Sequence, residues 1–428
     1  MTEDIFSNQK IWVVTVDMGY GHQRTADNLK HLSSGEKVIC ANNYDGMPLK
    51  DRKLWENSRK FYEAVSAFKR VPLVGGLAFA IFDFFQKVPQ FYPKRDLSKP
   101  DFTLKQLYRL IRKGWGRDLI EKLKKNPLPL ICTFFTQAFM AEFFEYPGEI
   151  FCTVCDTDMS RTWAPLDPQK SKIKYFAPTN RVVERLKLYG VRPENIFLTG
   201  YPLPLENTEN LEEDLKHRLL NLDPQKKFFE KYYPLLTEKL GPFPNRADHP
   251  LTMMFAVGGA GAQKEMAIAV LKSFKLKIQA KEFKMILVAG IRKTVKEYFE
   301  QEIENLGLSG QTKEFLEILF APNIKEYFQA FNKALRKTDI LWTKPSELSF
   351  YAALGLPIVI APTIGSHEEF NQRWLLQSNF GILQKDPSFA AEWTTDMINQ
   401  GHLAEKAFRS FIGGESQATI NIQKIVEK

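Results

Sequence analysis

Two glycine-rich turns carry the residue types in this sequence that could do chemistry. In the first, Gly19, Tyr20 and Gly21 lead from an apolar run to His22, and Arg24 follows at the start of a predicted helix. Glycines let a ligand approach the backbone, and the free amides of a helix N-terminus favour anionic or oxygen-rich groups. A histidine at this position can serve as a general base or bind an oxygen. The alternative is a histidine that only satisfies hydrogen bonds within the fold.

The second turn follows the apolar run "MMFAV". It consists of Gly258, Gly259, Ala260, Gly261 and Ala262, with a helix predicted to begin near Gln263. It has neither the Gly-Lys-Ser/Thr ending of a P-loop nor the GxGxxG spacing of dinucleotide-binding domains. Its amides and the positive end of the helix dipole suit a phosphate or diphosphate. Turns of this kind also occur for packing reasons alone.

Polar side chains flank a later strand-like run, "LPIVIAP". They are Lys344, Ser346 and Glu347 before it, and His367, Glu368 and Asn371 after it. Acids and amides at the end of a strand are the groups that sugar hydroxyls require. Residues 345–354 are predicted to begin a helix, which Ser346 would cap. The alternative is a solvated loop followed by a helix start.

A fourth stretch, "CTVCDTDMSRTW", combines two short patterns. Cys152 and Cys155 form one CxxC pair, and Asp156 and Asp158 flank a threonine. One CxxC pair without a second pair or histidines is a weak zinc pattern, so we predict no metal site and no cofactor. We expect the two aspartates to line the ligand-facing edge of the first domain.

These residues must be positioned by alternating strands and helices. Strand-like runs occupy 11–16, 37–43, 128–135, 149–156, 173–179, 195–203, 251–257, 283–290, 314–322, 340–343 and 356–362. Short buried strands separated by helices predict parallel sheets covered on both faces. The 428 residues predict two such domains, because one core rarely organises a chain of this length. The expected boundaries are 1–205, a partly helical linker or helical insertion at 206–250, a second domain at 251–400, and closing helices at 401–428.

Composition limits the class of protein. The chain is 44% hydrophobic and 25% charged, which is typical of soluble globular proteins. Its net charge of +9 suggests an anionic partner. This charge looks spread along the chain and no arginine-rich tail occurs, so we do not expect nucleic-acid binding. Few cysteines, no signal-peptide pattern and no apolar stretch of roughly 18 residues predict a cytoplasmic protein without a spanning helix.

The segment at 69–95 differs from the rest of the chain in its composition. It combines phenylalanines and small residues with basic residues at its ends: Lys69, Arg70, Lys87, Lys94 and Arg95. Such a segment can rest in the headgroup region of a membrane as a peripheral contact. The alternative is an ordinary buried helix.

Taken in order, the motifs resemble those of two-domain GT-B glycosyltransferases. The similarity is to monogalactosyldiacylglycerol synthase and to the peptidoglycan enzyme that adds N-acetylglucosamine to a lipid-linked acceptor. "DMGYGH" resembles their glycine-histidine loop, "TGYPL" resembles "TGNPV", "VGGAGAQ" resembles "GGSQGA", and "TKPSELSFYAALGLPIVIAPTIGSHEEFN" resembles their segment that holds the nucleotide-sugar. The resemblance implies two doubly wound Rossmann-like domains that face each other across a cleft.

The resemblance also implies roles for the residues named above. The turn at 258–263 would hold the diphosphate of a nucleotide-sugar, and the polar residues between Lys344 and Asn371 would bind the rest of the donor. The Gly19–Gly21 loop, with Arg24, would face a lipid or lipid-linked acceptor at a membrane surface. The general base would be one of four residues: His22, Asp17, Asp156 or Asp158.

The family has a ribose-binding glutamate where this chain has Phe350, and Glu347 lies one turn earlier. The implied reaction is metal-independent, inverting transfer of a sugar, with UDP as the expected nucleotide. Two alternatives stay open. One is a GT-B-fold nucleotide-sugar epimerase, and the other is a non-catalytic protein that binds a nucleotide-sugar.

Overall fold

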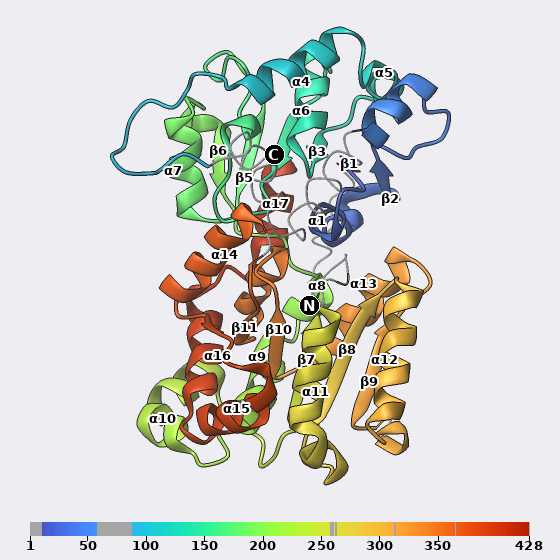
Figure 1. The fold of residues 1–428 in the computed structure, drawn as a ribbon. Coiled ribbons are helices and arrows are strands. Elements are labelled where there is room, and N and C mark those ends of the chain that lie inside the picture. The colour runs from blue at the N-terminus through green and yellow to red at the C-terminus, as the bar shows by residue number, and fades with distance from the viewer. Residues whose placement is uncertain are drawn as a thin grey trace. The chain divides into compact units, whose positions relative to one another are not determined.

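A computed structural model gives the fold, and it describes residues 11–57, 88–256, 261, 263–311, 314–363 and 365–427. The described residues form two compact units. The first contains those up to Pro202 and those from Gln417 onward, and the second is Leu203–Ser416 (Figure 1). The predicted pair of Rossmann-like domains is thereby confirmed.

The first unit is built on a parallel sheet in the order β2-β1-β3-β4-β5-β6. Its strands are β1 (Ile11–Thr15), β2 (Ser33–Cys40), β3 (Leu130–Cys132), β4 (Ile150–Thr153), β5 (Lys174–Ala177) and β6 (Ile196–Leu198). In the centre, Val13 is aligned with Val38 on one side and with Ile131 on the other.

Both faces of this sheet are buried, as the continuous apolar runs predicted. Val13, Ile131 and Phe151 face one layer, which contains Ile422 and Val426 from the last helix of the chain. Neighbouring strand residues point to the opposite layer, because successive side chains of a strand alternate between faces. The helices are α1 (Tyr20–Asn28), α4 (Phe102–Arg112), α5 (Arg117–Lys124), α6 (Phe135–Phe143), α7 (Asn180–Leu188) and α17 (Ala418–Val426), with short 3-10 turns η1 (Lys30–Leu32), η2 (Arg161–Trp163) and η3 (Pro193–Asn195).

The second unit is also a parallel six-stranded sheet, in the order β12-β11-β10-β7-β8-β9. Counted from β7, this is the order 3-2-1-4-5-6 of dinucleotide-binding Rossmann domains. The strands are β7 (Thr252–Ala256), β8 (Lys284–Gly290), β9 (Leu316–Phe320), β10 (Ile340–Thr343), β11 (Ile358–Ile360) and β12 (Gly381–Leu383). The sequence did not predict β12, a three-residue strand at the edge of the sheet with only one buried residue.

Helices cover this second sheet, and α11 and α12 lie along β7 to β9 (Figure 1). The helical elements are α8 (Leu205–Thr208), α9 (Leu211–Leu222), α10 (Lys227–Leu240), α11 (Lys264–Gln279), α12 (Lys293–Asn305), η4 (Ser309–Gln311), α13 (Ile324–Leu335), η5 (Glu347–Leu354), α14 (Ser366–Gln377), η6 (Pro387–Phe389), α15 (Ala390–Asn399) and α16 (His402–Gly413).

The structure corrects the expected domain boundaries. The stretch 206–250 is not a separate linker, because Leu215, Leu219 and Leu222 of α9 and two leucines of α10 are buried in the core of the second unit. Their three- and four-residue spacing is that of a helix with one buried face. The stretch 401–428 is also divided, since α16 belongs to the second unit and α17 to the first.

The segment predicted to face a membrane falls mostly outside the described residues. Of 69–95, the structure describes 88–95, which have no regular secondary structure. Within the described ranges, no helix is long and apolar enough to cross a membrane.

Each sheet has one point where the strand order reverses. It lies between β1 and β3 in the first unit and between β7 and β10 in the second. In open parallel sheets, ligands bind outside the carboxyl ends of the strands at such a switch point. Both predicted glycine-rich turns follow a strand that borders a switch point, namely β1 and β7.

The amino edge of the second sheet is held by a histidine between two carboxylates. The Nε2 atom of His249 lies 3.2 Å from Oδ1 of Asp339, and its Nδ1 lies 2.5 Å from Oδ1 of Asp248. The backbone amide of Thr252, at the start of β7, donates to the other oxygen of Asp339 at 2.7 Å. Burial opposes the charged ring, but the bonds to both carboxylates outweigh burial and raise the pKa of His249.

This raised pKa predicts a pH-dependent stability. A histidine with a higher pKa in the folded state stabilises the fold below its unfolded pKa of about 6.5, and the contribution is lost as pH rises through the folded pKa. The free energy of unfolding from urea denaturation should therefore fall across that window. His249→Gln should remove this component, whereas the exposed His402→Gln should retain it. Equal pH profiles for the wild type and His249→Gln would contradict this assignment.

Candidate functional site

His22 lies at the switch point of the first sheet and is fixed there by a backbone carbonyl. Its Nδ1 is 2.8 Å from the carbonyl oxygen of Thr133, the residue that follows β3. Because a carbonyl can only accept, Nδ1 must carry the proton of this bond. In the neutral ring, Nε2 is then unprotonated and has the lone pair that a general base requires. The hydroxyl of Thr133 donates to that of Thr15 at 2.9 Å, which joins the ends of β3 and β1.

The turn before His22 is shaped by Gly19 and by the first turn of α1. Gly19 has φ 123° and ψ 159°, a conformation that glycine alone adopts readily. The helix begins at Tyr20, earlier than predicted, so the amides of Tyr20, Gly21 and His22 belong to its first turn. The hydroxyl of Thr25 donates to the carbonyl of Gly21 at 2.8 Å and lies 3.0 Å from the hydroxyl of Tyr201. These contacts anchor the turn to the end of β6.

An aromatic cluster that the sequence analysis missed surrounds the His22 ring. The ring centroid of Phe134 lies 4.8 Å from that of His22, in an edge-to-face arrangement. Trp163 lies 6.2 Å from His22 and 5.0 Å from Phe135. Phe134 and Phe135 are only partly buried. The signal was present in the sequence, since the pair of phenylalanines forms the carboxyl end of the strand-like run predicted at 128–135.

Asp17 and Arg24, which were also predicted near this turn, differ from each other in exposure. Asp17 is exposed, and its carboxylate accepts a hydrogen bond of 2.5 Å from Nε2 of Gln23. Asn42 binds both the amide and the carbonyl of Asp17, at 2.8 and 3.1 Å, and so fixes its backbone. Arg24 is only 1% exposed. Its side chain is thus part of the packed interior, and its expected role beside an acceptor stays a prediction.

The two aspartates predicted as alternative bases are in unlike environments. Asp158 is 1% exposed and forms paired bonds with Arg185, at 2.7 and 2.9 Å, and a further bond of 2.9 Å with Arg181. Its carboxylate is held in a buried ion pair, so we expect a structural role for it in place of that of a base. Asp156 is partly exposed. Among the described residues no group of three or more histidines, cysteines and acids could hold a metal ion.

In the second unit, the residues predicted to bind the donor meet beside the end of β10. Nζ of Lys344 lies 2.5 Å from a carboxylate oxygen of Glu368, and the amide of Asn371 donates to the carbonyl of Pro345 at 3.2 Å. Glu368 and Asn371 are fully buried, whereas the side chain of Lys344 is a quarter exposed. Glu368 and Asn371 therefore hold the loop after β10, and Lys344 has the most exposed side chain of the three.

The glycine-rich turn of the second unit is described only in part. Residues 257–260, Ala262 and the side chain of His367 lie outside the described residues. Gly261 has φ +64°, and a Cβ atom there would lie 2.7 Å from Cγ2 of Val295 in α12. Gln263 precedes α11, as predicted, and its side-chain amide, through Nε2, donates to the carbonyl of Pro362 at 3.1 Å.

The segment after Lys344 differs from the predicted helix. It is the 3-10 helix η5, and all of its residues from Glu347 to Leu354 are buried. Ser346 precedes it without a side-chain capping bond. Phe350 is buried, and its ring centroid lies 5.3 Å from that of Trp374 in α14. Where the resembling family has a ribose-binding glutamate, this chain therefore has an aromatic packing residue.

The buried ion pair predicts that Asp158 is structural. Asp158→Asn leaves two arginines without their carboxylate, which should lower the free energy of unfolding by about 3–5 kcal/mol. The matched substitution Asp156→Asn should change stability far less, because Asp156 is partly exposed. Urea denaturation of both variants measures the difference. A stable Asp158→Asn variant that has lost only its activity would instead make Asp158 a catalytic residue.

Comparisons with known proteins agree with the fold and the motifs. Residues 244–377 match a family model described as "Domain of unknown function (DUF6938)". The processive diacylglycerol beta-glucosyltransferase of Bacillus licheniformis is 19% identical over 376 residues, which cover 85% of this chain and 80% of that protein. The protein of the same name from Bacillus subtilis is 19% identical over 401 residues, 92% of this chain and 87% of the relative.

Among solved structures, Staphylococcus aureus MnaA in complex with UDP has a TM-score of 0.51 and 12% identity, and the match covers 98% of this chain and 96% of that one. The likeness extends over both units and confirms the fold. The resemblance predicted from the motifs is also confirmed, because the two Bacillus relatives are glycosyltransferases named for a lipid acceptor. This chain is a two-domain protein of Rossmann-like fold that is similar in sequence to the two diacylglycerol glucosyltransferases over most of its length.

Proposed function

We propose that this protein is an inverting glycosyltransferase that moves a sugar from UDP to a lipid acceptor, with diacylglycerol as the first candidate. The observation that carries the proposal is the fixed imidazole of His22 at the switch point of the first sheet. The names of the Bacillus relatives support the reaction class and the acceptor, and the UDP-bound MnaA structure supports the nucleotide.

In the proposed reaction, Nε2 of His22 removes the proton of the acceptor hydroxyl. The acceptor oxygen attacks the anomeric carbon while the bond from that carbon to the diphosphate oxygen breaks, so the configuration inverts and UDP leaves. The imidazole gains a positive charge during this step. The carbonyl of Thr133 stabilises that charge, because its hydrogen bond with Nδ1 strengthens when the ring is protonated.

The leaving diphosphate needs positive groups around it. The first turn of α11 supplies backbone amides and the positive end of a helix dipole. Lys344 follows the neighbouring strand β10 and adds a full charge. Glu368 accepts a hydrogen bond from its ammonium group and so limits the positions that the group can adopt. Preorganised donors of this kind stabilise charge that develops in a transition state.

The aromatic cluster suits a lipid acceptor better than a free sugar. Phe134 and Phe135, which pack against the buried Trp163, place apolar surface beside the base, where the glycerol and upper acyl carbons of a diacylglycerol would lie. Diacylglycerol resides in bilayers, so the proposal includes action at a membrane surface. Nucleic acid has no part in it.

Replacing the base should slow sugar transfer strongly and leave the donor site intact. His22→Asn should lower kcat by about 10²–10⁴-fold, the usual contribution of a general base, with the Kd for UDP unchanged. The measurement is release of UDP from UDP-glucose on addition of detergent-dispersed diacylglycerol, with His31→Asn as the control. An unchanged kcat would contradict the assignment. Conversion of the nucleotide-sugar without acceptor would favour the epimerase alternative.

Lys344 offers a test of the donor side. Lys344→Met should raise the Kd for UDP by roughly tenfold or more, because a charge-assisted hydrogen bond contributes about 1.5–3 kcal/mol. Lys333→Met, an exposed lysine of α13, is the matched control. Isothermal titration with UDP measures both. Equal affinities for the two variants would remove Lys344 from the donor site.

A further inference from the structure

Two cations flank the glycine-rich turn of the second unit. The turn follows β7, which pairs with β10 on one side and with β8 on the other. The three strands are parallel, so the residues after them meet at one edge of the sheet. Lys344 follows β10, and Arg292 comes two residues after the end of β8. The strand order therefore places one cation on each side of the turn.

The side chain of Arg292 lies directly against this turn. A Cβ atom at Gly261 would lie 3.9 Å from Cδ of Arg292 and 2.7 Å from Cγ2 of Val295. The guanidinium group begins one bond beyond Cδ, so it also lies close to the turn. Arg292 is exposed. Its charge is therefore held beside the start of α11, where the proposed function places the diphosphate.

Backbone hydrogen bonds fix the position of Arg292. It is the residue before α12, and its amide donates to the carbonyl of Ala289 at 3.3 Å. Its own carbonyl accepts bonds from the amides of Val295 and Lys296, both at 3.1 Å. Because these three bonds hold its backbone, binding a ligand here orders only the side chain, which keeps the entropic cost of binding low.

One side of α12 packs on the start of α11. Val295 lies against Gly261, and the ring centroid of Tyr298 lies 4.4 Å from Nζ of Lys264, the first residue of α11. Positions three residues apart share one side of a helix. Arg292 comes three residues before Val295, so it begins the same row of side chains. The row faces the glycine-rich turn.

The neighbouring cation, Lys293, is oriented differently. Its Nζ lies 3.4 Å from a carboxylate oxygen of Glu297, one turn later in α12, and its side chain is 80% exposed. The first turn of α12 contains no acid. Two cations that are adjacent in the sequence therefore differ in their surroundings. Arg292 lies against the turn, whereas Lys293 pairs along its own helix.

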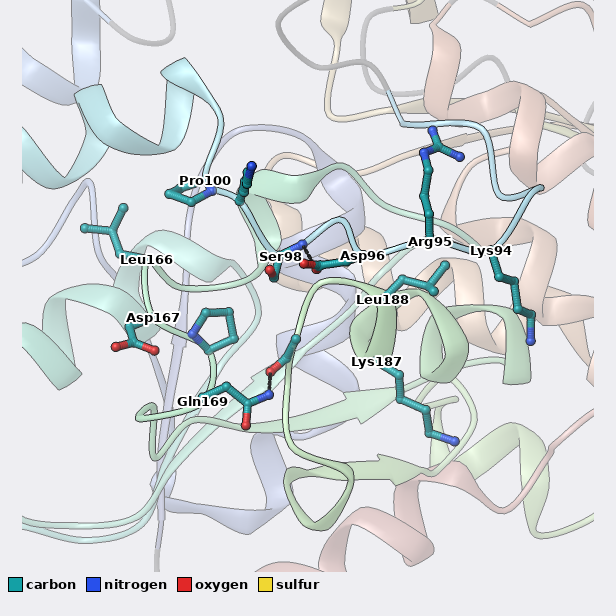
Figure 2. Close-up of a pocket in the computed structure, with 13 residues that line it drawn as sticks. Lys94, Arg95, Asp96, Ser98, Pro100, Leu166, Asp167, Gln169, Lys187 and Leu188 are labelled. Atoms are coloured by element: carbon teal, nitrogen blue, oxygen red, sulfur yellow. Dashed lines mark hydrogen bonds between the residues drawn. The ribbon is translucent and has the colours of Figure 1, made fainter.

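A groove in the first unit also gathers cations, but acids lie among them. It has a volume of about 760 Å³, and its charged lining includes Lys94, Asp96, Asp167 and Lys187 (Figure 2). Nζ of Lys94 and Nζ of Lys187 each lie 2.9 Å from a carboxylate oxygen of Glu184. A diphosphate in this groove would meet carboxylates as well as cations. The start of α12 suits a diphosphate better.

We propose that Arg292 binds the diphosphate of the donor from the side of the turn opposite Lys344. This inference rests on the proposed function, because it concerns the donor of that reaction. A guanidinium group presents its N–H donors in a planar fork that can bind two phosphate oxygens at once. When the bond between the anomeric carbon and the diphosphate oxygen breaks, both electrons stay on that oxygen. Arg292 stabilises this charge by hydrogen bonds and keeps its protons.

The test is isothermal titration of the full chain with UDP, UMP and inorganic pyrophosphate. Arg292→Gln should raise the Kd for UDP and for pyrophosphate by roughly tenfold to a hundredfold, because charge-assisted hydrogen bonds are lost. The Kd for UMP should rise less, since UMP offers one phosphate in place of two. Arg292→Lys should retain part of the affinity, because it keeps the charge but loses the fork.

Lys293→Gln is the matched control, because it removes the same charge one residue away and should bind UDP as the wild type does. Three results would each overturn the inference: an unchanged Kd for UDP in Arg292→Gln, an equal loss in both variants, or an equal loss for UMP. These results leave the proposed function standing when the wild type binds UDP. Binding of pyrophosphate that depends on Arg292, without binding of UDP, would instead support the inference and contradict the proposed nucleotide. A wild type that binds neither ligand would contradict both.

Discussion

The hydrogen bond between the His22 ring and the carbonyl of Thr133 is the interaction on which the first unit depends. It exists because β1 and β3 are neighbours in a parallel sheet, so that the residues after both strands meet at one edge. The strand order reverses there, so the helices that follow the two strands leave on opposite sides and the edge between them stays open. Gly19, Thr25 and Tyr201 then fix the turn that delivers the ring.

The switch point of the second sheet carries a charged side chain, Lys344, where the switch point of the first sheet carries the histidine His22. The strand order of this second sheet reverses between the paired strands β7 and β10, and Lys344 follows β10 directly. The buried carboxylate of Glu368 binds the lysine, and Asn371 binds the loop beside it. A cation held in this way, next to the first turn of a helix, suits a diphosphate. In the proposed reaction the first unit supplies the proton acceptor and the second unit supplies the site for the diphosphate.

The sequence was sufficient for the fold because each strand is a short apolar run bounded by glycine or polar residues. Of the twelve strands among the described residues it predicted eleven and missed only β12, and it predicted the turn that begins at Gly19. The site was harder to predict. Nothing local distinguishes Asp156 from Asp158, since the difference arises from arginines of α7 more than twenty residues away. Burial likewise separates Arg24 from the exposed arginines of α4, although all lie in helices that begin after a turn.

The central claim is that the fold holds His22 as a proton acceptor, with Nδ1 protonated and Nε2 unprotonated. Nitrogen-15 NMR of the histidine-labelled chain tests this most directly, with the His22 signals assigned by their loss in the His22→Asn variant. The account predicts that the neutral ring is the Nδ1–H tautomer, and that the Nε2 signal responds when a diacylglycerol analogue binds. A neutral His22 that is protonated at Nε2 and unprotonated at Nδ1 would contradict the account.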